Sequence, residues 1–153
     1  MRLVIQRVTE AEVRVDGESV GRIGRGFLVL VGAEKGDDSA AADEAARRVA
    51  GLRVFNDENG KMNLDLASVG GSVLAVSQFT LGADLSRGRR PGFERALAGD
   101  EARPLYERFV AALAGHGVPV STGRFGAMMQ VSLVNDGPAT FVLDVRSPGS
   151  EPG

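Results

Sequence analysis

The stretch FLVLV, Phe27 to Val31, lies between Gly26 and Gly32 and decides what kind of fold the chain can form. Its five apolar residues follow one another without polar alternation, a pattern typical of a strand that is buried on both faces. Such a strand needs other elements packed on it. The run therefore predicts a sheet with at least one covered face.

Upstream of this run the sequence predicts more β structure. Leu3 to Val8 and Ala11 to Val15 are expected to be strands, and Asp16-Gly17 is a two-residue hairpin signal. GRIGRG, residues 21 to 26, has the glycines of a phosphate-binding loop but leads into a strand, whereas such a loop leads into a helix N-terminus. We interpret it as a hairpin turn.

Two helices are expected downstream. Residues 37 to 55 carry an aspartate cap signal, early acidic and late basic residues, and apolar positions at helical spacing. In the second helix we expect Asp100 to be the N-cap and Pro104 to lie in the first turn. The apolar stripe of that helix consists of Leu105, Phe109 and Leu113.

These elements predict an α+β fold. A mixed, mostly antiparallel sheet should curl toward a barrel, with the two helices packed outside. The remaining strands are expected at Ser72 to Ser77, Val118 to Ser121, Met128 to Val134 and Thr140 to Val145. Residues 1–147 are expected to form a single domain and residues 148–153 a disordered tail. Since two helices cannot cover every face and edge of such a sheet, a homodimer is expected.

Composition excludes several classes of function. The 153 residues include no cysteine, so disulfides, thiolate nucleophiles and cysteine metal sites are excluded. No apolar run approaches the roughly 20 residues of a membrane span, and charges interrupt the N-terminus, so a cytoplasmic location is expected. A net charge of −2 argues against a general nucleic-acid binder. We expect no membrane and no DNA partner, and only local RNA contacts.

No metal or cofactor site is expected. His116 is the single histidine and lies at a helix end, where capping of carbonyls is its usual role. The loop FNDENGKMNLDL places Gly60 where a calcium loop has its glycine, but the first and last ligand positions would be Phe55 and Leu66. Neither side chain can bind a hard cation, so the loop is interpreted as a turn.

The densest positive charge is in SRGRRPGF, which contains Arg87, Arg89 and Arg90. A solvated loop and a phosphate clamp are both open interpretations of this cluster. The residues alone leave this choice undecided.

Two stretches carry hydroxyl or turn residues at positions of interest. SQFTL places Ser77 and Thr80 at the end of an apolar strand, where functional groups and ordinary strand-end residues are both common. NDGPAT, residues 135 to 140, contains the residues that turns require. Turn chemistry alone favours a plain hairpin corner between two strands.

Together these stretches resemble the D-aminoacyl-tRNA deacylase family, whose signatures are SQFTL and N-x-G-P-x-T. Both occur without a mismatch, with an RPGF loop and GRFGAMMQVSLVNDGPAT in the order of the family. The resemblance extends from RLVIQRV through GKMNL to FVLDVRSPG. It implies a hydrolase that releases free D-amino acid from the 3′ end of D-aminoacyl-tRNA, a proofreading activity in translation, and that also removes glycine mischarged on tRNA.

The resemblance also implies how D- and L-residues are separated. A cis Gly137-Pro138 bond would reach into the pocket of the other subunit of a homodimer, where backbone oxygens leave no room for an L side chain. Gln6 and Arg7 would anchor this dipeptide. The selector would then be backbone, and D-residues and glycine would fit.

The resemblance places Ser77, Gln78, Phe79 and Thr80 around the terminal adenosine and the ester, with backbone N–H groups as oxyanion donors. Phe125 and Met129 would lie against the adenine, with ordinary core packing as the alternative. The role of Thr80 stays open: it could be a nucleophile, a residue that positions water, or a scaffold. Positioning is favoured because no base is expected nearby. The alternative function is a non-catalytic dimeric module that binds tRNA ends or adenine nucleotides.

Overall fold

A computed structural model describes residues 1–147. The tail expected over residues 148–153 lies outside the described residues. The elements are β1 (Arg2–Val15), β2 (Glu18–Ile23), β3 (Gly26–Gly32), α1 (Ser39–Gly51), β4 (Phe55–Asn56), β5 (Met62–Leu64), α2 (Leu66–Val69), β6 (Ser72–Ser77), the 3₁₀ turn η1 (Phe79–Gly82), α3 (Gly99–Gly115), β7 (Val120–Thr122) and β8 (Gln130–Asp144).

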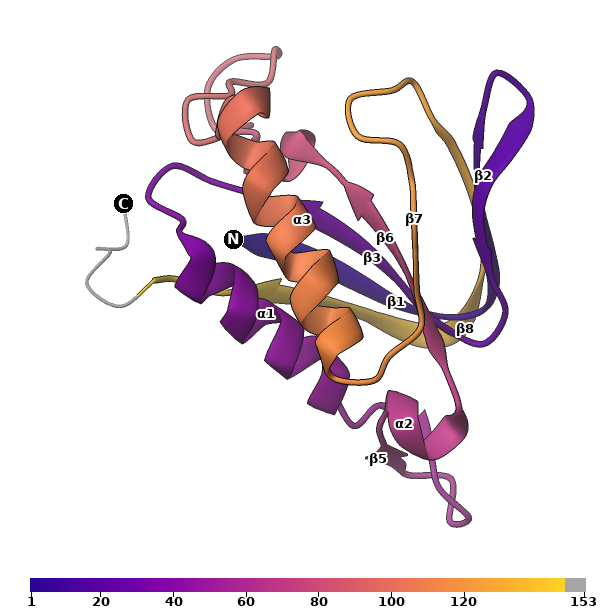
Figure 1. The fold of residues 1–153 in the computed structure, drawn as a ribbon. Coiled ribbons are helices and arrows are strands. Elements are labelled where there is room, and N and C mark those ends of the chain that lie inside the picture. Colours follow the sequence, from indigo (N-terminus) through magenta and orange to yellow (C-terminus); the bar gives the residue numbers. More distant parts are fainter. Residues whose placement is uncertain (148–153) are drawn as a thin grey trace.

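The sheet is mixed and nearly closes on itself (Figure 1). β1 pairs antiparallel with β2, β3 and β8, while β6 pairs parallel with β3 and with β7. At the far side β7 approaches β2, and the Ser121 hydroxyl donates to the Arg22 carbonyl at 3.4 Å. The predicted mixed sheet that curls toward a barrel is confirmed.

The start of the chain forms one long β ribbon. The two strands expected before Asp16 are the single strand β1, and Asp16 and Gly17 make the hairpin turn with φ of 50° and 80°. The prediction of a hairpin turn at residues 21–26 is wrong, because β2 and β3 follow one another along the same edge of β1. Gly26 is needed there because a Cβ would lie 1.7 Å from the Ser72 carbonyl oxygen.

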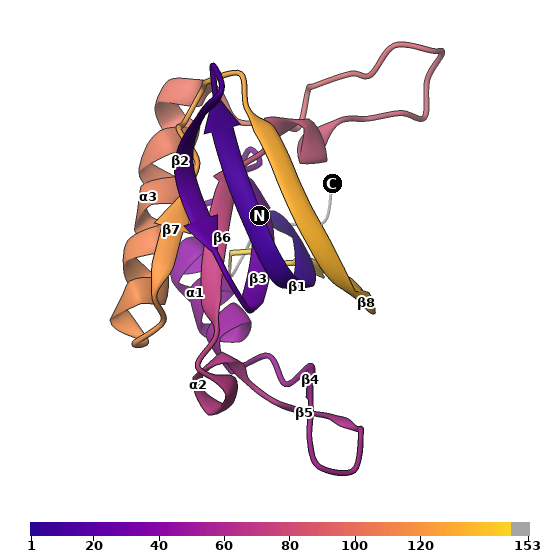
Figure 2. The same cartoon turned by 90° about the vertical axis from the view of Figure 1, so that its right-hand side faces the viewer.

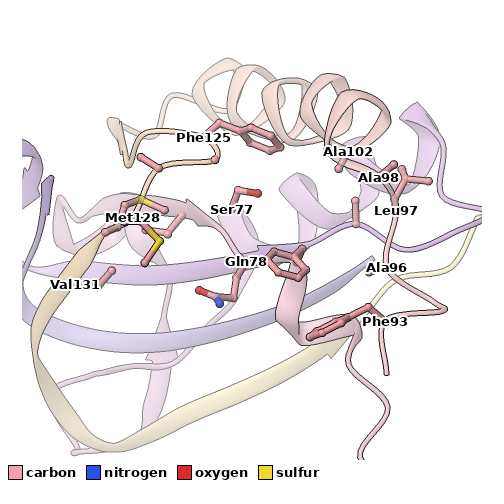
Figure 3. A pocket seen from close by; sticks show the side chains of 17 residues that line it. Ser77, Gln78, Phe93, Ala96, Leu97, Ala98, Ala102, Phe125, Met128 and Val131 are labelled. Atoms are coloured by element: carbon pink, nitrogen blue, oxygen red, sulfur yellow. The ribbon is translucent and has the colours of Figure 1, made fainter. Parts of the chain in front are cut away.

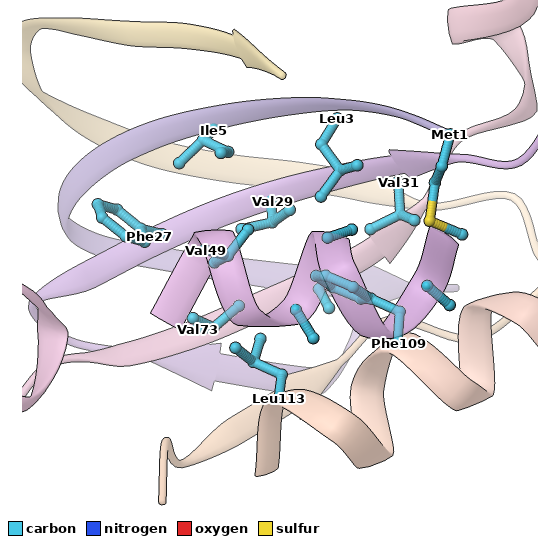
Figure 4. Close-up of a cluster of buried hydrophobic side chains, with 14 of the residues drawn as sticks. Met1, Leu3, Ile5, Phe27, Val29, Val31, Val49, Val73, Phe109 and Leu113 are labelled. Carbon is cyan, nitrogen blue, oxygen red and sulfur yellow. The ribbon is translucent and has the colours of Figure 1, made fainter. Parts of the chain in front are cut away.

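Helices α1 and α3 cover one side of the sheet, and their buried side chains meet those of β1, β3 and β6 (Figure 4). Asp38 caps α1 by accepting from the Ala41 N–H at 3.1 Å, as the aspartate signal indicated. On the inner face of α1 only small side chains and Val49 are buried, which lets the helix approach closely. These residues are Ala41, Ala42, Ala45, Ala46 and Val49.

The N-terminus of α3 differs from the prediction. Ala98 is the cap and makes no side-chain cap bond, so Asp100 lies within the first turn, where its charge favours the helix dipole. Pro104 consequently falls in the second turn. The four-residue helix α2, capped by Asp65, was not predicted because one turn carries no periodicity. Within residues 1–147 no helix is long and apolar enough to cross a membrane.

β8 is one continuous strand that contains the NDGPAT stretch. It pairs with β1 throughout, but the register jumps from Gln6 opposite Thr140 to Val8 opposite Asn135. Residues 135–140 therefore bulge out of a strand that keeps its direction, and we call them the Gly-Pro bulge. The prediction of a hairpin corner is wrong, because both flanking segments pair with the same strand and turn residues also make bulges.

Candidate functional site

A pocket of about 700 Å³ opens between the C-terminal end of β6, the segment before α3 and the segment before β8 (Figure 3). Its lining is mainly apolar and includes no acidic, basic or histidine side chain. The lining residues are Ala33, Val76, Ser77, Gln78, Phe79, Phe93, Ala96, Leu97, Ala98, Gly99, Ala102, Phe125, Gly126, Ala127, Met128, Met129 and Val131.

The SQFT stretch forms the polar end of the pocket. β6 ends at Ser77, and the Gln78 N–H donates to the Val31 carbonyl at 2.8 Å, which ties the stretch to the buried strand β3. η1 begins at Phe79, so the N–H groups of Phe79 and Thr80 belong to its first turn. Neither group donates to an acceptor within residues 1–147. Two N–H donors are thus available beside the pocket.

Thr80 lies at the edge of the pocket and does not line it. Its side chain is exposed, and its hydroxyl accepts from the Gln78 side-chain amide. No histidine, carboxylate or amine is bonded to the hydroxyl in the described residues. The arrangement offers Thr80 an orienting partner but no general base.

Phe125 and Met129 belong to both the pocket and the packing of the fold. The ring centroids of Phe125 and Tyr106 lie 5.9 Å apart, and Cζ of the Arg103 guanidinium lies 5.6 Å from the centroid of the Phe125 ring. The Tyr106 hydroxyl donates to the Ala75 carbonyl at 2.8 Å, and burial raises the pKa of this phenol to about 12. Tyr106 therefore stays a neutral donor that holds the Phe125 wall.

Arg7 and Gln6 lie against the Gly-Pro bulge. Arg7 is only 6% exposed; its Nε donates to the Asp136 carbonyl at 2.9 Å and its Nη1 to the Val54 carbonyl at 2.6 Å. The Gln6 amide donates to the Thr140 hydroxyl at 3.2 Å. A buried guanidinium thus connects the bulge to Val54, the residue before β4.

Asn135 fixes the bulge from within. Its amide nitrogen donates to the Arg7 carbonyl at 3.0 Å and to the Ala139 carbonyl at 3.1 Å. The Gly137-Pro138 bond between these contacts is cis, and both residues are exposed. Sequence reasoning did not single out Asn135, although an Asn at the start of a turn-rich stretch is a usual source of such side-chain-to-backbone bonds.

The predicted site residues therefore form two groups. Ser77, Gln78 and Phe79 line the pocket together with Phe125 and Met129. Gln6, Arg7, Gly137 and Pro138 gather at the bulge and are not part of the pocket lining of the same chain. Phe93 and Leu97 were missed as lining residues; the only sequence signal was the RPGF motif, which ends at Phe93.

Known proteins are similar to this chain over nearly its whole length. Residues 4–144 match the family model described as D-Tyr-tRNA(Tyr) deacylase. A D-aminoacyl-tRNA deacylase of Symbiobacterium thermophilum is 58% identical over 144 residues, covering 94% of this chain and 95% of the relative. A D-aminoacyl-tRNA deacylase of Geobacter sulfurreducens is 55% identical over 150 residues, covering 98% of this chain and 99% of the relative.

Solved structures share the fold. One titled c-Myc DNA unwinding element binding protein superposes with a TM-score of 0.89 at 37% identity, covering 96% of this chain and all of that one. A second, titled as a probable eukaryotic D-amino acid tRNA deacylase, has a TM-score of 0.80 at 21% identity. The match covers 94% of this chain and 98% of that one. With both motifs, the fold and this similarity in agreement, the chain belongs to the D-Tyr-tRNA(Tyr) deacylase family.

Proposed function

We propose that this protein hydrolyses the ester between a D-amino acid and the 3′-terminal ribose of tRNA. The observation that carries the proposal is the SQFT turn, which presents two free N–H groups beside an apolar pocket large enough for a nucleoside. Relatives at 55% to 58% identity are named for this activity. The products are free D-amino acid and intact tRNA, so the activity belongs to the proofreading of translation in the cytoplasm.

The pocket favours catalysis by positioning. An aminoacyl ester is an activated acyl group, and its hydrolysis needs a water oxygen to attack the carbonyl while the ribose oxygen leaves with a proton. The N–H groups of Phe79 and Thr80 are suited to bind the developing oxyanion, and the neighbouring ribose hydroxyl can exchange the proton. No residue of the pocket lining has to change its charge during this reaction.

Thr80 acts in this scheme as a positioning residue. Its hydroxyl is held by the Gln78 amide and lacks a base, which argues against a covalent acyl-enzyme. Replacement of Thr80 by Ala should retain activity within about tenfold. A loss of several orders of magnitude, together with a trapped acyl-enzyme, would favour a nucleophilic Thr80 instead.

The Gly-Pro bulge supplies the selection against L-residues from a second copy of the chain. The bulge is exposed, is absent from its own pocket lining, and belongs to β8, whose second edge pairs with no strand in residues 1–147. Val142 and Val134 on the same strand are 66% and 48% exposed. An unpaired edge with exposed apolar residues is suited to association of two copies.

Steric exclusion by backbone suits the selectivity that proofreading needs. A clash with the backbone can raise the activation barrier for the L-ester by several times about 1.4 kcal/mol, and each such step lowers the rate tenfold. Apolar pockets separate close analogues by only about 1–3 kcal/mol. D-residues and glycine place no side chain toward such a backbone. Glycine mischarged on tRNA is therefore a second substrate of the same site.

The other site residues have supporting roles. Phe125 and Met129 line the pocket opposite the SQFT turn and are assigned to the adenine of the terminal nucleoside. Arg7 and Gln6 are assigned to holding the bulge, in keeping with their bonds to Asp136 and Thr140. Residues 1–147 act as one domain, and no cofactor enters the scheme.

Hydrolysis of D-Tyr-tRNA and L-Tyr-tRNA by the purified protein tests the proposal. Amino acid should be released from the D-ester and not from the L-ester. A non-catalytic dimeric module that binds tRNA ends is the second candidate, and the lack of any titratable side chain in the lining favours it. Tight binding of either tRNA without D-selective release would establish that module and overturn the hydrolase.

A further inference from the structure

A projecting loop leaves the fold beside the pocket. Residues 84–92, which we call the basic arm, project away from the body of the molecule beyond η1 (Figure 2). Asp84 and Gly92 close the arm through two backbone bonds, of 2.7 Å and 2.9 Å. The Asp84 carboxylate accepts from the Ser86 N–H and hydroxyl, and Gly88 takes a φ of 65° at the tip. These bonds fix the base of the arm and its first turn.

The arginines of the arm lack the acidic partners that other arginines have. Arg87, Arg89 and Arg90 are exposed, and none makes an ion pair or hydrogen bond within the described residues. Seven of the 13 arginines elsewhere in residues 1–147 make ion pairs, namely Arg2, Arg7, Arg14, Arg47, Arg103, Arg108 and Arg146. In a chain with a net charge of −2, three unpaired guanidinium groups within four residues form a local anion-binding surface.

The arm starts where the proposed substrate must leave the pocket. Phe93 directly follows the arm, packs on Phe79 with ring centroids 5.3 Å apart, and lines the pocket together with it. A half-loop of about four residues extends at most about 13 Å from the Asp84–Gly92 closure. A 3′-terminal nucleoside in the pocket would therefore place the preceding phosphates of its strand within reach of the arginines.

We propose that the basic arm binds backbone phosphates of the tRNA next to its terminal nucleoside. This inference rests on the proposed function, since it takes an RNA 3′ end as the occupant of the pocket. Guanidinium groups bind phosphate oxygens with paired N–H donors, and such contacts carry no sequence information. The arm thereby supplies tRNA affinity independent of the base sequence, while the pocket receives the ester.

The test compares two triple variants on two substrates. The arm variant is Arg87→Ala, Arg89→Ala and Arg90→Ala; the control is Arg47→Ala, Arg48→Ala and Lys61→Ala, which removes the same charge from exposed positions on α1 and the β4–β5 hairpin. The substrates are D-Tyr-tRNA and the minimal ester D-tyrosyl-adenosine. Binding of uncharged tRNA is measured in parallel by fluorescence anisotropy.

For the arm variant, KM for D-Tyr-tRNA and Kd for tRNA should rise about tenfold or more at low salt. The slope of log Kd against log salt should fall by about two, since each phosphate contact contributes about 0.7 to 0.9. Hydrolysis of D-tyrosyl-adenosine and kcat on tRNA should be unchanged. The control should behave like the wild type.

Equal effects of both triple variants, or no change in tRNA affinity in the arm variant, would overturn the inference. Loss of activity on D-tyrosyl-adenosine in the arm variant would also overturn it, because the arm would then shape the pocket. Failure of the wild type on both esters is a failure of the proposed function. The anisotropy measurement still decides on the arm in that case.

Discussion

The SQFT turn and the Gly-Pro bulge look alike in sequence and differ in structure. Each follows an apolar strand segment and carries small polar residues. The SQFT turn borders a pocket built by its own chain, whereas the bulge is bonded firmly to β1 and faces solvent. The difference indicates that one chain holds a binding pocket and, separately, a bulge that does not line that pocket.

Removal of Arg7 should have the largest effect on the bulge. Arg7→Ala deletes buried charged bonds and leaves the Val54 carbonyl unpaired, at a cost of about 3 kcal/mol of stability. Activity on D-Tyr-tRNA should fall by about 10² or more, because the bulge loses its position. Urea unfolding and initial rates measure the two effects. Arg2→Ala, which removes a surface guanidinium from the same strand, should change neither by a comparable amount.

A methyl group at Gly137 should disturb the selector and spare the pocket. A Cβ there would lie 2.6 Å from the Asn135 side-chain oxygen and would displace the amide that donates to Arg7 and Ala139. Gly137→Ala should lower the ratio of D- to L-ester hydrolysis by up to about 10², the cost of a misplacement near 1 Å. Gly24→Ala, where a Cβ meets nothing within 4 Å, is the matched control. An unchanged ratio of D- to L-ester hydrolysis would show that the bulge does not select between the two esters.

Mixing two variants of low activity tests whether the two regions meet across copies of the chain. Gln78→Ala impairs the pocket, and Arg7→Ala impairs the bulge. Co-refolded heterodimers would contain one site with both regions intact, so about one quarter of wild-type activity should return. Activity that stays at the level of the separate variants would place both regions of a site in one chain.

The smallest effect is expected at the end of β8, away from both regions. The hydrogen bond from Arg2 holds the pKa of Asp144 below its usual value. Desolvation of the carboxyl opposes this shift, and the positive charge of Arg2 adds to it. Because the pKa of Asp144 is lower in the folded chain than the unfolded value of 3.8, the interaction stabilises the fold at pH values above 3.8. This stabilisation is lost as the pH falls through the folded pKa. Because both groups are partly exposed, Asp144→Asn should cost only about 0.5 kcal/mol near neutral pH.

Urea unfolding of wild type and Asp144→Asn measures this pH dependence. The difference between the two should shrink as pH falls through the folded pKa of Asp144, because the carboxyl is then protonated in both the folded and the unfolded chain. Activity and the D-to-L ratio should be unaffected at neutral pH. A change in selectivity would show that the end of β8 and the bulge act as one unit.

Local signals predicted much of the fold. The FLVLV run, the Asp16-Gly17 turn, the β6 boundaries and the Asp38 cap depend on neighbouring residues, and the structure has them where the sequence indicated. The paired SQFTL and N-x-G-P-x-T motifs indicated the family for the same reason, since motif residues keep their order along the chain.

Errors arose where strand pairing overrides local chemistry. NDGPAT and GRIGRG contain turn residues, yet both flanking segments pair with one edge of β1, so the chain bulges or bends without reversing. Asp100 was expected to cap α3 because its residue type favours the cap, but the cap lies two residues earlier, at Ala98, and the helix begins at Gly99.

By itself the sequence determined the strands, the two long helices and the two motifs, because periodicity and turn chemistry act over a few residues. Only the tertiary structure decided that Ser77, Phe93 and Phe125 share a pocket while Gly137 lies outside it. It also decided that the Arg7 side chain is buried and joined to Asp136. These relations depend on which strands pair along β1, and pairing between distant segments is set by burial over the whole sheet.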